Sequence, residues 1–230
     1  MRTLYLIGMM GCGKSTCAGI LGGRLGLPVL DTDGEIERKE GRTVSEIFAA
    51  QGEDTFRELE TALLRTLASR EDLVVSCGGG LPLRAENRTL LRAGITVFLN
   101  RDPEKIDETA DMSGRPLGQA GKAAFLERFR QREPLYLEAA DIVIGDCGTP
   151  EETVEEILKQ LESRGALTRC SRISLRRNAG KPGMCFLRTS RASVSSVPIP
   201  LRCGLPRRGS ASPRRRTPAA RPRGCRRPAG

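Results

Sequence analysis

The stretch Gly8-Met9-Met10-Gly11-Cys12-Gly13-Lys14-Ser15 decides the fold of this chain, because it fits the pattern GxxxxGK[ST]. A short apolar run at 4–7 precedes it and predicts a buried strand, while apolar residues recur at helical spacing over 14–25 after it. A glycine-rich turn between a strand and a helix points successive backbone N–H groups at phosphate oxygens. The stretch, called the phosphate loop below, therefore predicts a site for a nucleoside triphosphate.

Two side chains of the phosphate loop have chemical roles in such a site. Lys14 can reach the β and γ phosphates, and the Ser15 hydroxyl can ligate Mg²⁺. The loop and the start of the following helix are expected to bind the nucleotide together, through Gly11, Cys12, Gly13, Lys14, Ser15 and Thr16.

Four further apolar runs predict strands, and the segments between them show helical spacing. The runs cover 29–30, 73–75, 95–99 and 140–144, and the helical patterns cover 33–40, 43–51, 53–69 and 150–161. Strands separated by helices form βαβ crossovers, which build a parallel sheet with helices on both faces. The predicted class is therefore α/β, with about five parallel strands in a three-layer arrangement.

The residue types that are missing exclude several classes of enzyme. The chain contains no histidine, so it has neither a Ser-His-Asp triad nor an HExxH zinc site. Its eight cysteines form no CxxC pair, which argues against a zinc ribbon or a thioredoxin-type site. No apolar run approaches the roughly 18–20 residues of a transmembrane helix, and no secretory signal is recognised. We therefore expect a cytoplasmic protein with reduced cysteines that binds no membrane.

Charge divides the chain into two unlike parts. Residues 1–164 have a net charge of −7, whereas 165–230 carry 17 basic residues and no acidic ones. Arginine, proline and serine dominate the second part, and such a composition builds no packed core. We predict a catalytic domain over 1–164 and a disordered basic tail over 165–230. The tail has two alternative explanations: non-specific binding of polyanions such as RNA, or translation of a shifted or read-through frame with no evolved role.

Two carboxylates follow the second predicted strand. Asp31 and Asp33 lie where that strand ends, at the sheet edge where ligands of open α/β folds bind. One carboxylate can face the water shell of a metal while the other faces a substrate hydroxyl. The alternative is structural, because Asp33 precedes a predicted helix and is suited to be its N-cap.

Three arginines and a run of glycines are the remaining candidates. Arg57 and Arg132 lie in helical patterns, where arginine is often only a solvated surface charge. The run 78–80 permits close approach of the backbone to a ligand, or simply forms a tight turn. Arg115 lies in 109–122, a stretch without strong apolar periodicity. That stretch looks like a mobile lid that carries a cation for phosphoryl transfer.

Taken together, these motifs resemble shikimate kinase. The resemblance runs from about residue 3 to residue 162 through GMMGCGKST, DTDGEIE, GRTVSEIF, GEDTFRELE, the triple glycine, RPL and REPLY. It implies the phosphate-loop fold of the nucleoside-monophosphate-kinase branch, with strand order 2-3-1-4-5. It also implies transfer of the γ-phosphoryl of ATP to the 3-hydroxyl of shikimate, on the route to chorismate and aromatic amino acids. The implied enzyme uses Mg²⁺. We expect it to work as a monomer, and to bind no specific nucleic acid because no RNA-binding fold is visible.

The resemblance also implies roles for individual residues. Asp33 matches the residue that receives the reacting hydroxyl, and Asp31 matches one that supports Mg²⁺, bound at Ser15, through water. Arg57 and Arg132 match a clamp on the shikimate carboxylate, which suits the planar donor fork of guanidinium. Glu60 matches a residue that orients Arg57. Gly79 and Gly80 match residues that contact the substrate through their backbone. Arg115 matches a catalytic residue that acts with Lys14 and Asp33.

The nucleotide side departs from the family pattern in two places. The segment 106–114 lacks the arginine that helps hold adenine in many members, and Gly118 follows RPL where a second leucine is common. Two other functions are therefore weighed: a kinase of the same fold acting on another hydroxy acid such as gluconate, and polyanion binding by the tail. Arg57, Arg132 and the triple glycine favour shikimate over gluconate.

Overall fold

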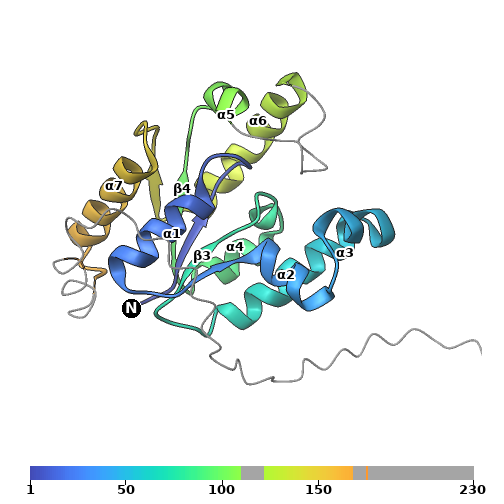
Figure 1. The fold of residues 1–230 in the computed structure, drawn as a ribbon, viewed down its shortest axis with the longest axis horizontal. Helices are drawn as coiled ribbons and strands as arrows, with labels where there is room; N and C mark the ends of the chain where they lie inside the picture. The colour runs from blue at the N-terminus through green and yellow to red at the C-terminus, as the bar shows by residue number, and fades with distance from the viewer. Residues whose placement is uncertain (110–121, 168–174, 176–230) are drawn as a thin grey trace, which may run out of the picture. The chain divides into compact units, whose positions relative to one another are not determined.

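The computed structural model describes residues 1–109, 122–167 and 175. These residues fold around a five-stranded parallel sheet in the order β2-β3-β1-β4-β5 (Figure 1). The predicted class and strand order are both confirmed. The strands are β1 (Leu4–Ile7), β2 (Val29–Asp31), β3 (Val74–Ser76), β4 (Ile95–Leu99) and β5 (Ile142–Ile144).

Strand β1 is the centre of the sheet and pairs with β3 on one side and β4 on the other. Leu4 is in register with Val74 of β3 and with Ile95 of β4. Every residue of β1 and β4 is buried, as expected for strands whose two faces are both covered by helices. The apolar runs 4–7 and 95–99 are therefore central strands of the core, whereas β2 and β5 form the edges of the sheet.

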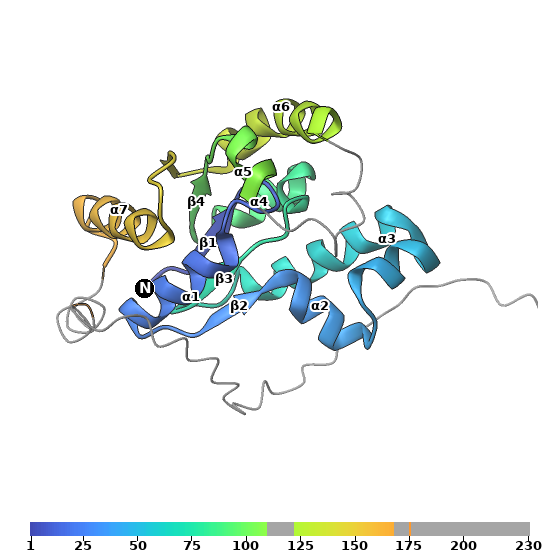
Figure 2. The ribbon, with the colours of Figure 1, turned by 45° about the horizontal axis from the view of Figure 1, so that its top comes forward.

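The helices form two groups, one on each face of the sheet (Figures 1 and 2). Helices α1 and α7 contact each other, whereas α4 contacts both α3 and α6. The bounds are α1 (Lys14–Leu25), α2 (Thr32–Glu40), α3 (Val44–Leu67), the 3-10 turn η1 (Leu81–Leu83), α4 (Ala85–Leu91), α5 (Pro103–Thr109), α6 (Lys122–Ala139) and α7 (Pro150–Ser163).

Local sequence signals explain where several helices begin and bend. Thr43 and Glu46 form the predicted capping box at the start of α3, and Thr149 caps α7 in the same way. The two helical patterns predicted on either side of Gly52 are one helix, α3, with a kink at that glycine. Gly52 adopts φ 83°, which a helix interior does not accommodate, so the chain changes direction there.

The carboxylate that caps α2 is Asp31, so the alternative that made Asp33 the cap is wrong. Oδ1 of Asp31 accepts hydrogen bonds from the backbone N–H groups of Asp33 and Gly34. Asp33 instead lies inside the first turn of the helix. Asp33 is therefore not the N-cap residue of this helix.

Parts of two sequence-based expectations lie outside the described residues. Thr109 and Lys122, the ends of the predicted lid, belong to α5 and α6, while Arg115 is not described. Of the predicted tail, only 165–167 and 175 are described. Leu167 is buried and Ala166 packs against the core, so core packing continues past Arg164. Within the described ranges, no helix has the length and apolar character needed to cross a bilayer.

Candidate active site

The phosphate loop connects β1 to α1 at the carboxyl edge of the sheet. Gly13 adopts φ 91° and is the N-cap residue of α1. A side chain at Gly13 would be strained in this left-handed conformation, so glycine is needed for the tight entry into the helix. The loop therefore surrounds the N-terminus of α1. The positive end of the helix dipole there favours binding of an anion.

Lys14 is buried and turns back over the phosphate loop. Its ammonium Nζ donates hydrogen bonds to the carbonyl oxygens of Gly8, at 3.0 Å, and Met9, at 2.8 Å. Two backbone carbonyls hold the charge in place but do not neutralise it. The ammonium is thus already beside the loop that is expected to receive phosphates.

Three oxygen-bearing side chains meet next to the start of α1. The Ser15 hydroxyl donates to Oδ2 of Asp31 at 2.9 Å and lies 3.1 Å from the hydroxyl of Ser76. Ser15, Asp31 and Ser76 come from α1, β2 and β3, so the parallel sheet brings them to one edge. Such a set of hard oxygen ligands suits Mg²⁺, which is usually held by one or two carboxylates, waters and substrate phosphates.

The segment 31–33 is tied to the glycine run that follows β3. Gly78 donates its backbone N–H to the hydroxyl of buried Thr32 at 2.8 Å. A Cβ at Gly78 would lie 2.7 Å from Oε1 of Glu60 and closer still to Oδ1 of Asp33. Only glycine fits there, because any side chain would displace these two carboxylates.

Arg57 is a buried cation fixed by two acidic residues on its own helix. Its Nη1 donates to Glu60 at 2.7 Å, and Nη2 and Nε both donate to Glu53. The guanidinium carbon lies 6.0 Å from the Phe48 ring centroid and 5.7 Å from that of Phe56. Burial lowers the pKa of Arg57, but Glu60 and Glu53 together outweigh it and raise the pKa above its ordinary value. Arg57 therefore stays charged and keeps one orientation.

Glu60 is fully buried between Arg57 and Asp33. Burial raises its pKa to about 7; Arg57 opposes the rise, and the negative charge of Asp33 adds to it. Among the described residues, its Oε1 has no hydrogen-bond partner. Protonation of Glu60 is thus coupled to the charges that surround the cavity.

The stability of the wild type should fall relative to that of Glu60→Gln as pH rises from about 5 to about 7. A carboxyl group whose pKa is raised on folding binds more protons in the folded state than in the unfolded state over this window. The stability that such a group adds to the fold is fully present below the pKa of the group in the unfolded chain, and is lost as pH rises through its pKa in the folded protein. A folded-state pKa of about 7 corresponds to a loss of about 3 kcal/mol in the free energy of unfolding across this pH range. Urea denaturation at a series of pH values measures it.

The control for this experiment is Glu53→Gln, which removes the half-exposed carboxylate that also pairs with Arg57. We expect its stability curve to stay parallel to that of the wild type over the same pH range. Parallel curves for Glu60→Gln as well would contradict the raised pKa of Glu60.

Arg132 is a second buried cation and comes from α6. Burial lowers its pKa, and its interaction with the Tyr136 hydroxyl partly offsets that. Even so, a guanidinium remains protonated near neutral pH. Tyr136 in turn donates a hydrogen bond to the Gly79 carbonyl at 2.6 Å.

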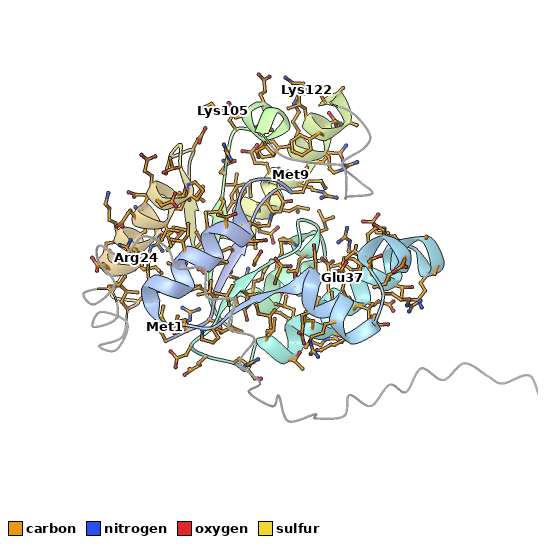
Figure 3. The ribbon with its side chains drawn as sticks, viewed as in Figure 1. Met1, Met9, Arg24, Glu37, Lys105 and Lys122 are labelled. Atoms are coloured by element: carbon orange, nitrogen blue, oxygen red, sulfur yellow. The ribbon has the colours of Figure 1, made fainter. Side chains whose placement is uncertain are left out.

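One cavity of about 780 Å³ joins these groups. It is bordered by the phosphate loop, by α2 and α3, and by the glycine run. Glu37, labelled on α2 in Figure 3, lies on its lining and accepts a hydrogen bond from Val44 at the start of α3. The predicted residues that line it are Gly11, Gly13, Lys14, Ser15, Thr16, Asp31, Asp33, Arg57, Glu60, Gly79, Gly80 and Arg132.

Cys12 is the predicted loop residue that does not line this cavity. It lines a smaller hollow of about 30 Å³ together with Gly13, Cys17, Arg101 and the loop 145–150 between β5 and α7. The phosphate loop therefore separates two recesses, and the larger one contains both carboxylates of the 31–33 segment.

Sequence reasoning missed four residues with clear positions in this site. Ser76 and Thr32 are ordinary residues at strand ends, and Phe48 and Tyr136 match helical core positions. Their partners are distant in sequence, so local patterns could not assign them. The available signals were the position of Ser76 at the end of a strand, directly before 77–80, and the motifs DTDGEIE, GRTVSEIF and REPLY, which contain Thr32, Phe48 and Tyr136.

The arrangement separates charge along the cavity. Lys14 and the N-terminus of α1 form a positive region at one end, and Arg57 with Arg132 forms another. Asp33 and Glu60 lie near the second pair. The cavity can therefore bind a polyphosphate on the loop and a small acid between the arginines, and the Asp33 carboxylate lies on the same lining.

Comparison with protein families and relatives gives one consistent result. A family model described as shikimate kinase matches residues 10–162. The shikimate kinase of Bacillus cytotoxicus is 38% identical over 166 residues, which are 71% of this chain and 100% of that protein. The shikimate kinase of Clostridium botulinum strain Alaska E43 is 37% identical over 157 residues, 68% of this chain and 94% of that protein.

A solved structure matches the same region. The shikimate kinase from Acinetobacter baumannii, in complex with shikimate, superposes with a TM-score of 0.68 and 37% identity. The match covers 71% of this chain and 94% of that one.

Proposed function

The chain belongs to the shikimate kinase family, and from that premise we propose that the 780 Å³ cavity holds shikimate against Arg57 and Arg132, with ATP on the phosphate loop. The protein is an ATP-dependent kinase that phosphorylates the 3-hydroxyl of shikimate. The observation that carries the proposal is that two buried arginines and Asp33 line the same cavity as Lys14.

The acceptor end of the cavity suits a small carboxylic acid with several hydroxyl groups. Arg57 and Arg132 offer planar donor forks, which bind a carboxylate through paired hydrogen bonds. Asp33 accepts the hydrogen bond of the reacting hydroxyl. Because phosphoryl transfer has a loose transition state, Asp33 positions that hydroxyl as much as it removes its proton.

The donor end of the cavity stabilises the charge of the transferring phosphoryl group. Lys14 moves its hydrogen bonds from the loop carbonyls to phosphate oxygens. Ser15, Asp31 and Ser76 would hold Mg²⁺, with Asp31 acting through water, and the ion would neutralise charge on the β and γ phosphates. Arg115, which lies outside the described residues, would add a further cation from the predicted lid.

We place the nucleotide base on the side of the loop that carries Cys12. The small hollow there is lined by Arg101 and by the loop 145–150, which leads into α7. Arg101, whose Nε lies 4.0 Å from Asp146, is thus a cation on this side of the loop, where 106–114 lacks the arginine common in the family. We also propose that the enzyme acts as a monomer.

Arg132→Lys is expected to raise the KM for shikimate by about 10- to 100-fold, since a lysine cannot make the paired hydrogen bonds of a guanidinium. The value of kcat should change much less, because the carboxylate is bound equally in the ground and transition states. Steady-state kinetics with varied shikimate at saturating ATP measures both values. Arg130→Lys, on the exposed side of α6, should leave both unchanged; an unaltered KM in Arg132→Lys would contradict the clamp.

A substrate panel tests the acceptor directly. Shikimate should give a kcat/KM well above that of gluconate and other hydroxy acids. A panel in which gluconate is preferred would favour the alternative of a related kinase.

RNA binding by the full chain that persists after removal of 165–230 would show that the tail does not cause it.

A further inference from the structure

Tyr136 connects three parts of the site through one hydroxyl group. Its ring is fully buried and packs on Phe98 of β4, with ring centroids 5.1 Å apart. Its hydroxyl donates to the Gly79 carbonyl at 2.6 Å and lies 3.7 Å from Sδ of Met9 in the phosphate loop. Met9 is labelled in Figure 3, beside α6. Burial raises the pKa of Tyr136 to about 12, so the hydroxyl remains a donor.

The peptide unit that Tyr136 contacts lies between the two halves of the cavity. A Cβ on Gly79 would be 3.4 Å from the backbone N of Met10, in the phosphate loop. A Cβ on Gly80 would overlap the guanidinium of Arg57. In a planar trans peptide, the Gly79 C=O and the Gly80 N–H point in opposite directions. A hydrogen bond that fixes the carbonyl therefore also fixes where that N–H points.

Arg132 depends on the same hydroxyl. It lies one helical turn before Tyr136 on α6, so the two side chains share a face, and its guanidinium interacts with the hydroxyl. Arg57, by comparison, is held by Glu53 and Glu60. Among the residues that the structure describes, Arg132 forms no ion pair with a carboxylate. The Tyr136 hydroxyl is thus the described polar side-chain group that interacts with this guanidinium.

We propose that Tyr136 is a positioning residue for the acceptor, which sets the Arg132 guanidinium and the Gly79–Gly80 peptide in one fixed arrangement. This role rests on the proposed function, because both groups are assigned there to shikimate. The phosphate side needs no such link, since Lys14 is held by the phosphate loop itself. Loss of the hydroxyl should therefore affect shikimate more than ATP.

The test compares Tyr136→Phe with Tyr5→Phe. These are the two tyrosines of the chain, and both are buried. The Tyr5 hydroxyl, in β1, has no hydrogen-bond partner among the described residues, which makes it a matched control. Tyr136→Phe should raise the KM for shikimate about tenfold, with kcat and the KM for ATP within about threefold. Tyr5→Phe should leave all three within about twofold of the wild type.

A spectroscopic readout covers the case in which Tyr136→Phe folds poorly. In Tyr5→Phe, Tyr136 is the only tyrosine, so a ¹³C label on the phenol carbon that bears the hydroxyl gives one NMR signal. Because a carboxylate bound to Arg132 changes the charge beside the hydroxyl, that signal should shift when shikimate is added. ADP alone should leave it in place.

Several results would overturn the role of Tyr136. An unchanged KM for shikimate in Tyr136→Phe would do so, as would equal losses for shikimate and ATP, or a ¹³C signal that does not respond to shikimate. These outcomes differ from failure of the proposed function. In that case the wild type itself would release no ADP in response to shikimate, and the role of Tyr136 would fall with it.

Discussion

Lys14→Ala is expected to lower kcat by about 10³-fold or more, the scale seen when a charge that stabilises a transition state is removed. In the described structure the ammonium is buried, and its hydrogen bonds go to two carbonyl oxygens and the Cys12 sulfur of the phosphate loop. It is therefore free to move to phosphate oxygens when a nucleotide arrives. Alanine leaves the loop without its one internal cation, and the γ-phosphoryl group loses that stabilisation as it transfers.

The assay for Lys14→Ala is shikimate-dependent ADP release at saturating ATP. The matched control is Lys159→Ala on α7, whose side chain is 72% exposed and pairs only weakly with Glu156. It should retain full activity. A Lys14→Ala enzyme within tenfold of the wild type would contradict the role of the phosphate loop as the donor site.

Asp33→Asn is expected to lower kcat by about 10²- to 10⁴-fold, the range typical of general acid–base groups. Asparagine has nearly the same shape, but it cannot take a proton and offers a weaker acceptor to the shikimate hydroxyl. The helix should survive the change, because Asp31 and not Asp33 accepts the N-terminal hydrogen bonds of α2. The loss should therefore fall on catalysis and spare folding.

Two measurements distinguish a loss of catalysis from a loss of stability in Asp33→Asn. Thermal unfolding of Asp33→Asn should stay close to that of the wild type, and its KM for ATP should be nearly unchanged. Asp54→Asn, an exposed carboxylate on α3, is the control and should be fully active. Robust turnover by Asp33→Asn would show that another group receives the hydroxyl.

The phosphate loop and the central strands could be predicted from the sequence because their signals are local. The pattern of residues 8–15 defines a turn by itself, and fully apolar runs such as 4–7 have few alternatives to a buried strand. The capping box at Thr43 is equally local. These features depend on residues no more than a few positions apart.

Helices α4 and α5 were not predicted, and α6 was predicted only as a helical pattern near Arg132 without bounds, for a physical reason in each case. The first two are only one to two turns long, and α6 contains Pro134 in its interior. Short helices gain little from periodic packing, and an internal proline removes one backbone hydrogen bond. Contacts with β4 and with other helices hold α6 in place instead.

The site shows the same division between local and distant signals. Asp33, Arg57 and Arg132 were found as residues suited to an acidic acceptor, although each was also suited to a surface or capping role. The burial of Arg57 and Arg132, and the one cavity that all three residues line, favour the role at the acceptor. The contributions of Ser76 and Tyr136 appear only in three dimensions, because the sheet and α6 bring them to partners far away in the sequence.

The most direct test of the whole account is a coupled ADP-release assay on the full chain with ATP and Mg²⁺, with and without shikimate. We predict ADP release that depends on shikimate and saturates with it, together with one phosphorylated product carrying phosphate on the 3-hydroxyl, identified by ³¹P NMR. ADP release that is the same without shikimate, or a product phosphorylated elsewhere, would contradict the account.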